Sequence, residues 1–263
     1  MSDLPPDFPA APRLDSQLAP DDRPELRCAF LTRRTARARL AACPLAWLPV
    51  GCLEKHGDHL PMGLDPIKAE LICLAGARAL GGLVFPAHFY SGVHRFQGTP
   101  EGDFHVREWG DLYTYRSTET HLIEILDQIA RIGARAVVLF SGHHPRAQME
   151  LLQRVAAHFR VLAPTAADPL VVIPGDERTL LGEGDHAGIW ETSLLLHLAP
   201  ALVDLRRIDD TNRRDHQWTD ATDARRASAA QGAQRLAAIL AELRSRLQAA
   251  CPALPLQGPK PAP

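Results

Sequence analysis

The feature that most constrains the fold of this chain is an apolar run, Leu45–Val50, that leads directly into a polar loop. The run predicts a buried strand. The loop carries Glu54, His56, His59 and Asp65, with glycine and proline between them. Loops at the carboxyl ends of parallel strands are where α/β proteins build their sites. We therefore expect a parallel sheet with a functional site at the carboxyl end of this strand.

Further apolar segments alternate with helical patterns along the chain. Apolar spacing and turn signals predict helices over residues 29–42, 67–80, 118–132, 147–159, 188–198 and 224–249. Short apolar runs predict strands over residues 45–50, 83–85, 136–140, 160–163 and 170–173. Strands that alternate with helices predict βαβ units. The expected fold class is therefore α/β, with a mainly parallel sheet covered by helices on both faces.

The length of 263 residues suits one α/β domain or two small ones. We expect a single α/β domain over residues 25–250. Residues 1–24 are rich in proline and aspartate, and we expect them to be disordered. Residues 251–263 are again rich in proline, and we expect an irregular tail there.

Charge and cysteine content argue against several classes of protein. The formal net charge is -2, so nothing favours a nucleic-acid or membrane-surface partner. The five cysteines include no C-x-x-C pair, which indicates reduced thiols and a cytoplasmic protein rather than a disulfide framework. No apolar run approaches the roughly 18 residues of a membrane-spanning helix. The N-terminus also lacks the basic start and hydrophobic region of a signal peptide.

The polar loop offers the mixture of carboxylate and imidazole ligands that Zn, Mn and Fe accept. Glu54 and His56 are two residues apart, so their side chains point the same way in an extended segment. Asp65 has two oxygens and can bridge two metal ions. His143 follows the expected strand 136–140 and arrives from a neighbouring strand end. Each residue alone is more commonly a surface or capping residue, whereas the four together favour a metal site.

Three segments of the chain carry these residues in order. They read EKHGDHLPMGLD over residues 54–65, SGHHP over residues 141–145 and GDHAGIWETS over residues 184–193. Together they resemble the motifs of the creatininase (creatinine amidohydrolase) family. The first and third segments match that family closely, and the second matches in part. The resemblance spans about residues 44–205.

The resemblance implies a three-layer α/β/α sandwich that holds a dinuclear metal site. It implies two divalent metal ions per subunit, Zn with Zn, Mn or Fe. Glu54 would bind one ion, His56 and His143 the other, and Asp65 would lie between them. It also implies a homo-oligomer, often a hexamer, that acts on a small-molecule amide.

The third motif supplies two further candidates. The resemblance implies that His186 is catalytic, as a proton carrier or a substrate contact. It also implies that Glu191 lies at the site, as a catalytic residue or a metal ligand. Glu191 falls near a helix start, where a carboxylate is favoured in any case, so a capping role stays open. His59 is expected to hold the loop in place, because ligand imidazoles commonly need an outer partner.

The second motif departs from the family pattern at Pro145, where family members carry Gly or Glu. Proline offers neither a ligand atom nor a backbone N–H. Glu191 or a water would then complete the ligands of one ion. His144 either joins Arg146 in a distinct substrate pocket or faces solvent.

Residues 90–115 form a loop without clear periodicity, which is similar to a further segment of the creatininase family. The candidate substrate-binding residues are Ser91 and His94 in this loop, with His144 and Trp190 from the second and third motifs. Trp109 and Tyr113 are further candidates for the pocket wall, although buried aromatic residues are at least as common in packed loops.

The sequence thus predicts a metal-dependent hydrolase of a non-peptide carbon–nitrogen bond, an amide or cyclic amide, in a small molecule. Two metal ions would activate the attacking water. Two alternatives stay open: a peptidase-like maturation factor of the same family that acts on a peptide precursor, and a non-catalytic binding module on this fold. The departures at Pro145 and near Ser91 argue against assuming creatinine as the substrate.

Overall fold

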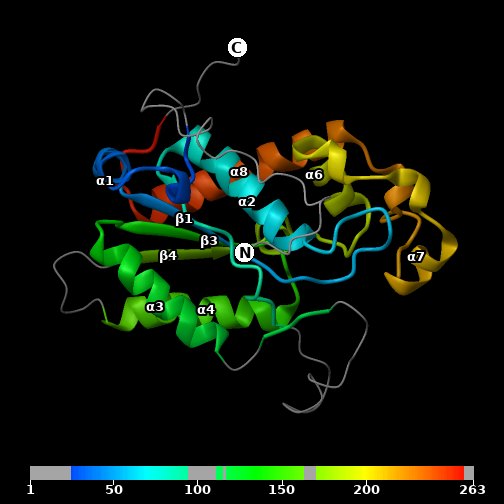
Figure 1. Ribbon diagram of the computed structural model, residues 1–263, viewed down its shortest axis with the longest axis horizontal. Helices are drawn as coiled ribbons and strands as arrows, with labels where there is room; N and C mark the ends of the chain where they lie inside the picture. Colours follow the sequence, from blue (N-terminus) through cyan, green and yellow to red (C-terminus); the bar gives the residue numbers. More distant parts are fainter. Residues whose placement is uncertain (1–24, 94–110, 115–116, 163–169, 258–263) are drawn as a thin grey trace, which may run out of the picture.

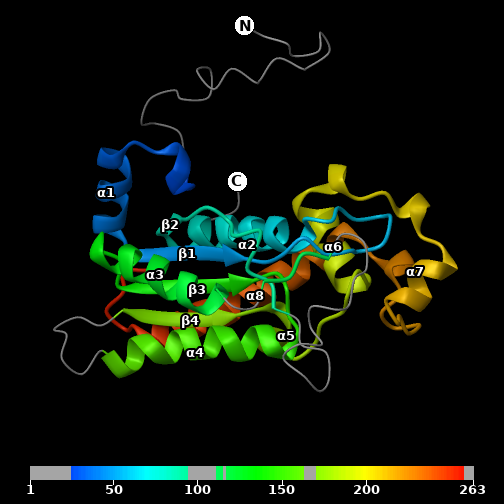
Figure 2. The same cartoon turned by 60° about the horizontal axis from the view of Figure 1, so that its bottom comes forward.

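The computed structural model describes residues 25–93, 111–114, 117–162 and 170–257. Among these residues, four parallel strands form one sheet in the order β2-β1-β3-β4. The strands are β1 (Leu45–Val50), β2 (Leu83–Val84), β3 (Ala136–Ser141) and β4 (Val171–Gly175). β1 pairs with β3 along its full length, from Leu45 opposite Ala136 to Val50 opposite Ser141. Because all four strands run in the same direction, their carboxyl ends lie together at one end of the sheet (Figure 2).

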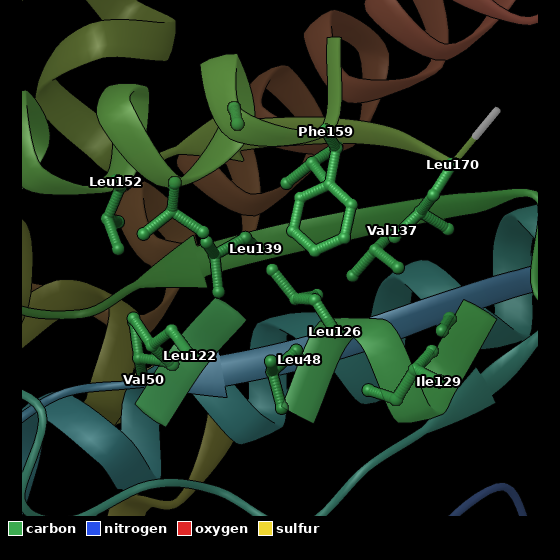
Figure 3. Packing of buried hydrophobic residues seen from close by; sticks show 14 of the residues in the cluster. Leu48, Val50, Leu122, Leu126, Ile129, Val137, Leu139, Leu152, Phe159 and Leu170 are labelled. Atoms are coloured by element: carbon green, nitrogen blue, oxygen red, sulfur yellow. The ribbon is translucent and has the colours of Figure 1, made fainter. Parts of the chain in front are cut away.

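Helices cover both faces of this sheet (Figure 1). α2 (Leu64–Leu80) and α8 (Ala229–Ala250) lie on one face, and α3 (Thr118–Arg131) and α4 (Arg146–Leu162) lie on the other. Strand side chains alternate between the two faces. In β1, Leu45 and Trp47 pack in the core with α2 and α8, whereas Leu48 and Val50 pack with α3 and α4 (Figure 3). The expected α/β/α sandwich with a mainly parallel sheet is confirmed.

Trp47 fixes the position of α2 on the sheet. Its indole lies against Gly76, where an added Cβ would stand 2.5 Å from the ring. The indole N–H donates a hydrogen bond of 2.9 Å to the carbonyl of Gly81, so this buried donor is satisfied. Gly81 has φ +95° and ends α2. The first turn of α2 is thereby held at the carboxyl ends of β1 and β3.

Most predicted elements are confirmed, with differences at their ends. α1 (Arg33–Ala42) begins after Thr32, whose side chain accepts a hydrogen bond from the Thr35 N–H, and a separate 3-10 turn covers Cys28–Phe30. α6 covers Ile189–Leu198. α2 begins at Leu64 rather than at residue 67. Asp65 therefore lies in a helical turn and not in an irregular loop.

Two predictions of secondary structure are wrong. The strand expected over residues 160–163 does not form where the chain is described, because residues 160–162 continue α4. The helix expected over residues 224–249 is interrupted. A 3-10 turn covers Ala224–Arg226, and α8 begins after Ser228, whose hydroxyl accepts a hydrogen bond from the Gln231 N–H. A serine at this position is a strong start signal for a helix.

Two short helices were not predicted: α5 (Glu177–Leu181) and α7 (Asp210–Asp215). Each begins with reciprocal side-chain capping, Asp176 with Thr179 and Asp209 with Asn212. Both helices are too short for a hydrophobic period to emerge. Two 3-10 turns, Pro200–Leu202 and Leu205–Arg207, follow α6. α5 is important for the site because it directly follows β4.

The expected disordered segment, residues 1–24, lies outside the described residues, and the domain boundaries stay a prediction. In the part of the chain that the structure describes, no helix combines the length and apolar character needed to cross a bilayer.

The core on the α3 face can be tested with Leu122→Ala. Leu122 is fully buried beside Leu126 (Figure 3). Its truncation should lower the free energy of unfolding by about 2–5 kcal/mol, because a cavity replaces packed methyl groups. Urea denaturation followed by circular dichroism measures this change. The control is Ile132→Ala at the end of the same helix, where the residue is 58% exposed. Equal stability of the two variants would contradict the packing of α3.

Candidate metal centre

Glycines at the ends of β1 and β3 allow α2 to approach the strands closely. Gly51 follows β1, and a Cβ there would stand 2.8 Å from the Asp65 Cβ. Gly142 follows β3, and a Cβ there would overlap the Asp65 carbonyl. The Glu54 N–H donates a 3.0 Å hydrogen bond to the Met62 carbonyl, which closes the loop. These contacts bury Asp65 between the two strand ends.

The two oxygens of Asp65 face different imidazoles. Oδ2 lies 3.2 Å from His143 Nδ1, which is also 2.9 Å from Glu54 Oε2. Oδ1 lies 3.3 Å from His56 Nε2, which is 3.6 Å from Glu191 Oε2. Two donor sets therefore share Asp65: the first donor set adds Glu54 and His143, and the second adds His56 and Glu191. This grouping differs from the expected one, in which His56 and His143 share an ion.

The orientation of His56 leaves its Nε2 available to a metal ion. Nδ1 lies 3.0 Å from the carbonyl of Glu54. A carbonyl only accepts hydrogen bonds, so Nδ1 is the donor. In the neutral ring, Nε2 then carries the lone pair, and it points at the carboxylates of Asp65 and Glu191. Ligand imidazoles in metal sites are commonly oriented by such a bond to a carbonyl.

Without a bound ion, protons balance the buried charge of the cluster. Burial disfavours the charged form of His56, but Asp65 and Glu191 outweigh it and raise the pKa of His56 to about 9. Burial also disfavours the ionised form of Glu54, yet His143 holds the pKa of that carboxyl well below its usual range. A metal cation would have to displace the imidazole protons.

Cys52 lies at the edge of the first donor set. Its thiol is 3.5 Å from Asp65 Oδ2 and 3.9 Å from Glu54 Oε2. Burial raises the pKa of this thiol, so it keeps its proton and donates to the carboxylates. The oxygen and nitrogen atoms are therefore better ligand candidates than the sulfur.

A buried ammonium group fixes the position of Glu191. Lys68 on α2 is fully buried, and its Nζ lies 2.9 Å from Glu177 Oε2 and 2.5 Å from Glu191 Oε1. Glu191 Oε2 accepts a 2.7 Å hydrogen bond from the Ala187 N–H. Burial disfavours the ionised carboxyl, but Lys68 and His56 outweigh it and lower the pKa of Glu191 to about 2. Glu191 is thus ionised, with Oε2 toward His56.

The sequence left open a helix-capping role for Glu191, but Asp185 makes the capping contacts. Its Oδ2 accepts a 2.7 Å hydrogen bond from the Trp190 N–H, and its Oδ1 accepts one of 3.2 Å from the Glu191 N–H. A carboxylate is favoured at a helix N-terminus. Burial and the charge of Glu191 nevertheless raise the pKa of Asp185 to about 7. The side chain of Glu191 is consequently free to face the second donor set.

Both donor sets open into one pocket of about 490 Å³. Its wall is formed by Glu54, His56, Asp65, Gly142, His143, His144, Pro145, Arg178, Gly184, Asp185, His186, Glu191, His216 and Gln217. A pocket of this size suits a small molecule.

His186 stands beside both donor sets. Its ring lies edge-on to His56, with 4.7 Å between the ring centroids. Its Nε2 is 3.0 Å from the Lys55 carbonyl and 3.6 Å from Glu54 Oε1. Burial and the charge of His56 lower the pKa of His186. The imidazole is therefore neutral near pH 7 and close enough to the donor sets to exchange protons there.

His144 and Pro145 line the pocket, but Arg146 does not join them. His144 Nε2 donates a 2.7 Å hydrogen bond to the Asp185 carbonyl, and the side chain is only 13% exposed. The alternative in which His144 faces solvent is therefore wrong. The Arg146 side chain is 91% exposed and pairs with Glu150, so a pocket shared by His144 and Arg146 does not form.

Ser91 and Trp190 do not reach the pocket wall in the described part of the chain. Ser91 is buried, and its carbonyl accepts a hydrogen bond from the Gln148 side chain. Trp190 packs its ring against the guanidinium of Arg235, 4.8 Å from the ring centroid. His94 and Trp109 lie outside the described residues, so their roles stay predictions.

His59 and Tyr113 contact the site from outside. His59 Nε2 lies 3.1 Å from both the Ala187 carbonyl and Thr192 Oγ1. It thus ties the loop to α6, which fits the expected role of holding that loop. The Tyr113 hydroxyl donates a 2.7 Å hydrogen bond to Glu54 Oε1. Tyr113 thereby orients a carboxylate of the first donor set.

Lys68, Glu177, Arg178 and His216 were not predicted as site residues. Lys68 lies among the buried residues of α2, and a lysine on a buried helix face signals a buried acidic partner. Glu177 and Arg178 lie on α5, which the sequence pattern did not indicate. His216 lies 4.8 Å from His186 between ring centroids but belongs to none of the three motifs.

Comparison with known proteins assigns the family. The chain matches the family model described as creatininase (creatinine amidohydrolase) over residues 29–247. The chain belongs to the creatininase family. It is 34% identical to a creatinine amidohydrolase of Pseudomonas putida over 197 residues, which cover 68% of this chain and 74% of that protein. It is 29% identical to a mycofactocin precursor peptide peptidase of Mycobacterium tuberculosis over 183 residues, covering 65% and 64% of the two chains.

Solved creatininase structures have the same fold. One creatininase superposes with a TM-score of 0.64 at 25% identity, covering 86% of this chain and 98% of that chain. A creatininase variant of Zn–Zn type has a TM-score of 0.63 at 26% identity. A creatininase structure named for Mn has a TM-score of 0.62 at 26% identity, and both have the same coverage as the first. The chain is thus an amidohydrolase of this family, and its described residues include clusters that can hold metal.

The role of Lys68 can be tested with Lys68→Met. The substitution leaves Glu177 and Glu191 buried without their cation, and loss of one partner of a buried ion pair costs about 3–5 kcal/mol. We expect a fall of that size in the free energy of unfolding, measured by urea denaturation of the protein treated with a chelator. Adding Glu177→Gln to Lys68→Met removes one orphaned charge and should recover part of the loss. No recovery would mean that Lys68 acts by packing alone.

Proposed function

We propose that this chain is a metal-dependent hydrolase of an amide or cyclic amide bond in a small molecule. One observation carries the proposal: the two oxygens of Asp65 face two different imidazoles, at 3.2 Å and 3.3 Å, one in each donor set. A buried carboxylate shared by two sets of oxygen and nitrogen donors suits a pair of divalent ions. Relatives described as Zn–Zn and Mn types support the same chemistry.

The donor chemistry fits zinc or manganese, two ions per subunit. The proposed ligands are Glu54, Asp65 and His143 for one ion and His56, Asp65 and Glu191 for the other. Each ion would then have carboxylate and imidazole ligands, a combination that borderline divalent metals accept. When bound, such ions polarise an amide carbonyl and lower the pKa of a water molecule. Glu191 thereby replaces the ligand that Pro145 does not offer.

Residues of the chain itself would orient the reactants and move protons. His186 is the proposed proton carrier to the leaving nitrogen, because its neutral imidazole lies on the pocket wall beside both donor sets. Tyr113 keeps Glu54 in place through its hydroxyl, and Lys68 does the same for Glu191. Positioned groups of this kind lower the barrier by orientation.

A peptidase of the same family is the second candidate, because the chain is also 29% identical to a mycofactocin precursor peptide peptidase. A pocket of about 490 Å³ has room for a small molecule or for one end of a peptide. Cleavage of a peptide without turnover of small amides would favour this candidate. The two complete donor sets argue against a purely binding module. That this chain forms a homo-oligomer, as the family resemblance implies, stays a prediction.

The metal content gives the first test. Elemental analysis of the purified protein should find about two divalent ions per subunit, and Asp65→Asn should lose most of both, because Asp65 belongs to both donor sets. At least one member of a panel of small amides should be hydrolysed by the wild type and by the control variant but not by Asp65→Asn. Asp58→Asn is the matched control, because Asp58 is exposed in the same loop. A wild type that takes up no Zn or Mn would exclude the proposal.

Metal uptake should release protons. The pKa of His56 is raised to about 9, so at pH 7 its imidazole carries a proton that a metal ion must displace. Metal affinity should therefore rise between pH 6 and pH 9, as the proton on His56 is lost. Calorimetry of Zn binding in two buffers of different ionisation enthalpy counts the protons, and we expect at least one per subunit.

The proton count needs a control that removes a histidine elsewhere. His197→Gln changes an exposed imidazole on α6 that belongs to neither donor set, and it should release as many protons as the wild type. His56→Gln should release fewer. Equal proton release by all three proteins would contradict a ligand role for His56.

A further inference from the structure

The pocket wall near the carboxyl end of β4 carries a positively charged side chain. Arg178 lies on α5, and it is the only lysine or arginine among the described residues that line the pocket. Other arginines nearby have acidic partners: Arg146 pairs with Glu150, and Arg235 pairs with Glu183. Within the described residues, the guanidinium of Arg178 makes no ion pair or hydrogen bond. An arginine with unused donors in a pocket is available to a ligand.

Gly184 keeps the space beside Arg178 open. A Cβ at Gly184 would stand 3.3 Å from the Arg178 Cβ and 3.3 Å from His144 Nε2. His144 uses that nitrogen to donate to the Asp185 carbonyl. Pro145, also on the wall, has neither charge nor a backbone N–H. Among these residues, Arg178 is therefore the permanently charged group that can recognise an anionic substrate.

The charge of the pocket also favours an anion once the proposed ions are bound. The proposed ligands include three carboxylates, whereas two divalent ions bring four positive charges. Lys68 and Glu177 offset each other, and the carboxylate of Asp185 on the pocket wall offsets one further positive charge. Arg178 adds a positive charge to this balance. A pocket lined by positive charge attracts anionic substrates.

We propose that Arg178 forms a carboxylate-binding subsite and that the substrate is an amide that also carries a carboxylate group. This inference rests on the proposed hydrolase function and names its substrate class. A guanidinium presents a planar fork of N–H donors that fits a carboxylate through two parallel hydrogen bonds. The amide would lie at the donor sets while Arg178 holds the carboxylate. The subsite thus orients the bond to be cleaved and discriminates against neutral amides.

A matched pair of probes tests the subsite by binding rather than by activity. N-acetylglycine carries an amide and a carboxylate, and N-acetylglycinamide is its neutral counterpart. Nuclear magnetic resonance titration of the Zn-loaded wild type should give at least about tenfold tighter binding of N-acetylglycine, the size of one charge-assisted contact. Arg178→Gln should reduce this preference to about twofold or less. Arg178→Lys should retain part of it, because the charge remains but the fork is lost.

Arg146→Gln is the control for a general loss of positive charge. Arg146 is exposed near the pocket and does not line it, so this variant should keep the full preference. An undiminished preference in Arg178→Gln would mean that the carboxylate binds the metal ions, and it would overturn the subsite while leaving the hydrolase proposal intact. A wild type that does not prefer N-acetylglycine, or does not bind it, would also overturn the subsite.

The same titration without metal separates the two proposals. A protein that takes up no Zn but still prefers N-acetylglycine, with the preference lost in Arg178→Gln, would refute the hydrolase and support the subsite. A protein that binds two Zn ions and hydrolyses neutral amides as well as carboxylate-bearing ones would support the hydrolase and refute the subsite.

Discussion

The site depends on one buried carboxylate, that of Asp65, held where two strands end and a helix begins. The N-terminus of α2 favours a negative charge at this point. Gly51 and Gly142 leave the space that the first turn of α2 occupies, and the contact of Trp47 with Gly76 fixes α2 on the sheet. The same packing that builds the core therefore places one carboxylate between two imidazoles.

Burial of several carboxylates near Asp65 would destabilise the fold unless positive charge accompanied them. Lys68 supplies one permanent charge, shared between Glu177 and Glu191. In the absence of metal, protons on His56 and His143 supply the rest, since acidic neighbours raise the pKa of both imidazoles despite the opposing effect of burial. Metal ions that replace these protons would bind the folded chain far better than the unfolded one. The proposed catalytic site and the stability of the fold are consequently linked.

The sequence predicted the features that depend on local pattern. The strand at residues 45–50 has the bounds expected, and Glu54 and His56 converge because the segment carrying them follows a buried strand. Features that depend on tertiary contacts were missed. Lys68 needs the partners Glu177 and Glu191, more than one hundred residues away. Trp190 lies within the third motif, yet only its backbone N–H serves the site, because its ring packs on α8.

Pro145 on the pocket wall offers no ligand atom. A ligand at that position would come from the loop after β3, whereas Glu191 comes from α6 and is held by a lysine of α2. The second donor set is therefore complete without the β3 loop. Pro145 brings no charge to the pocket wall, and among the described residues Arg178 is the arginine that lines it. Family membership thus accounts for the class of reaction, while residues outside the family motifs would select the substrate.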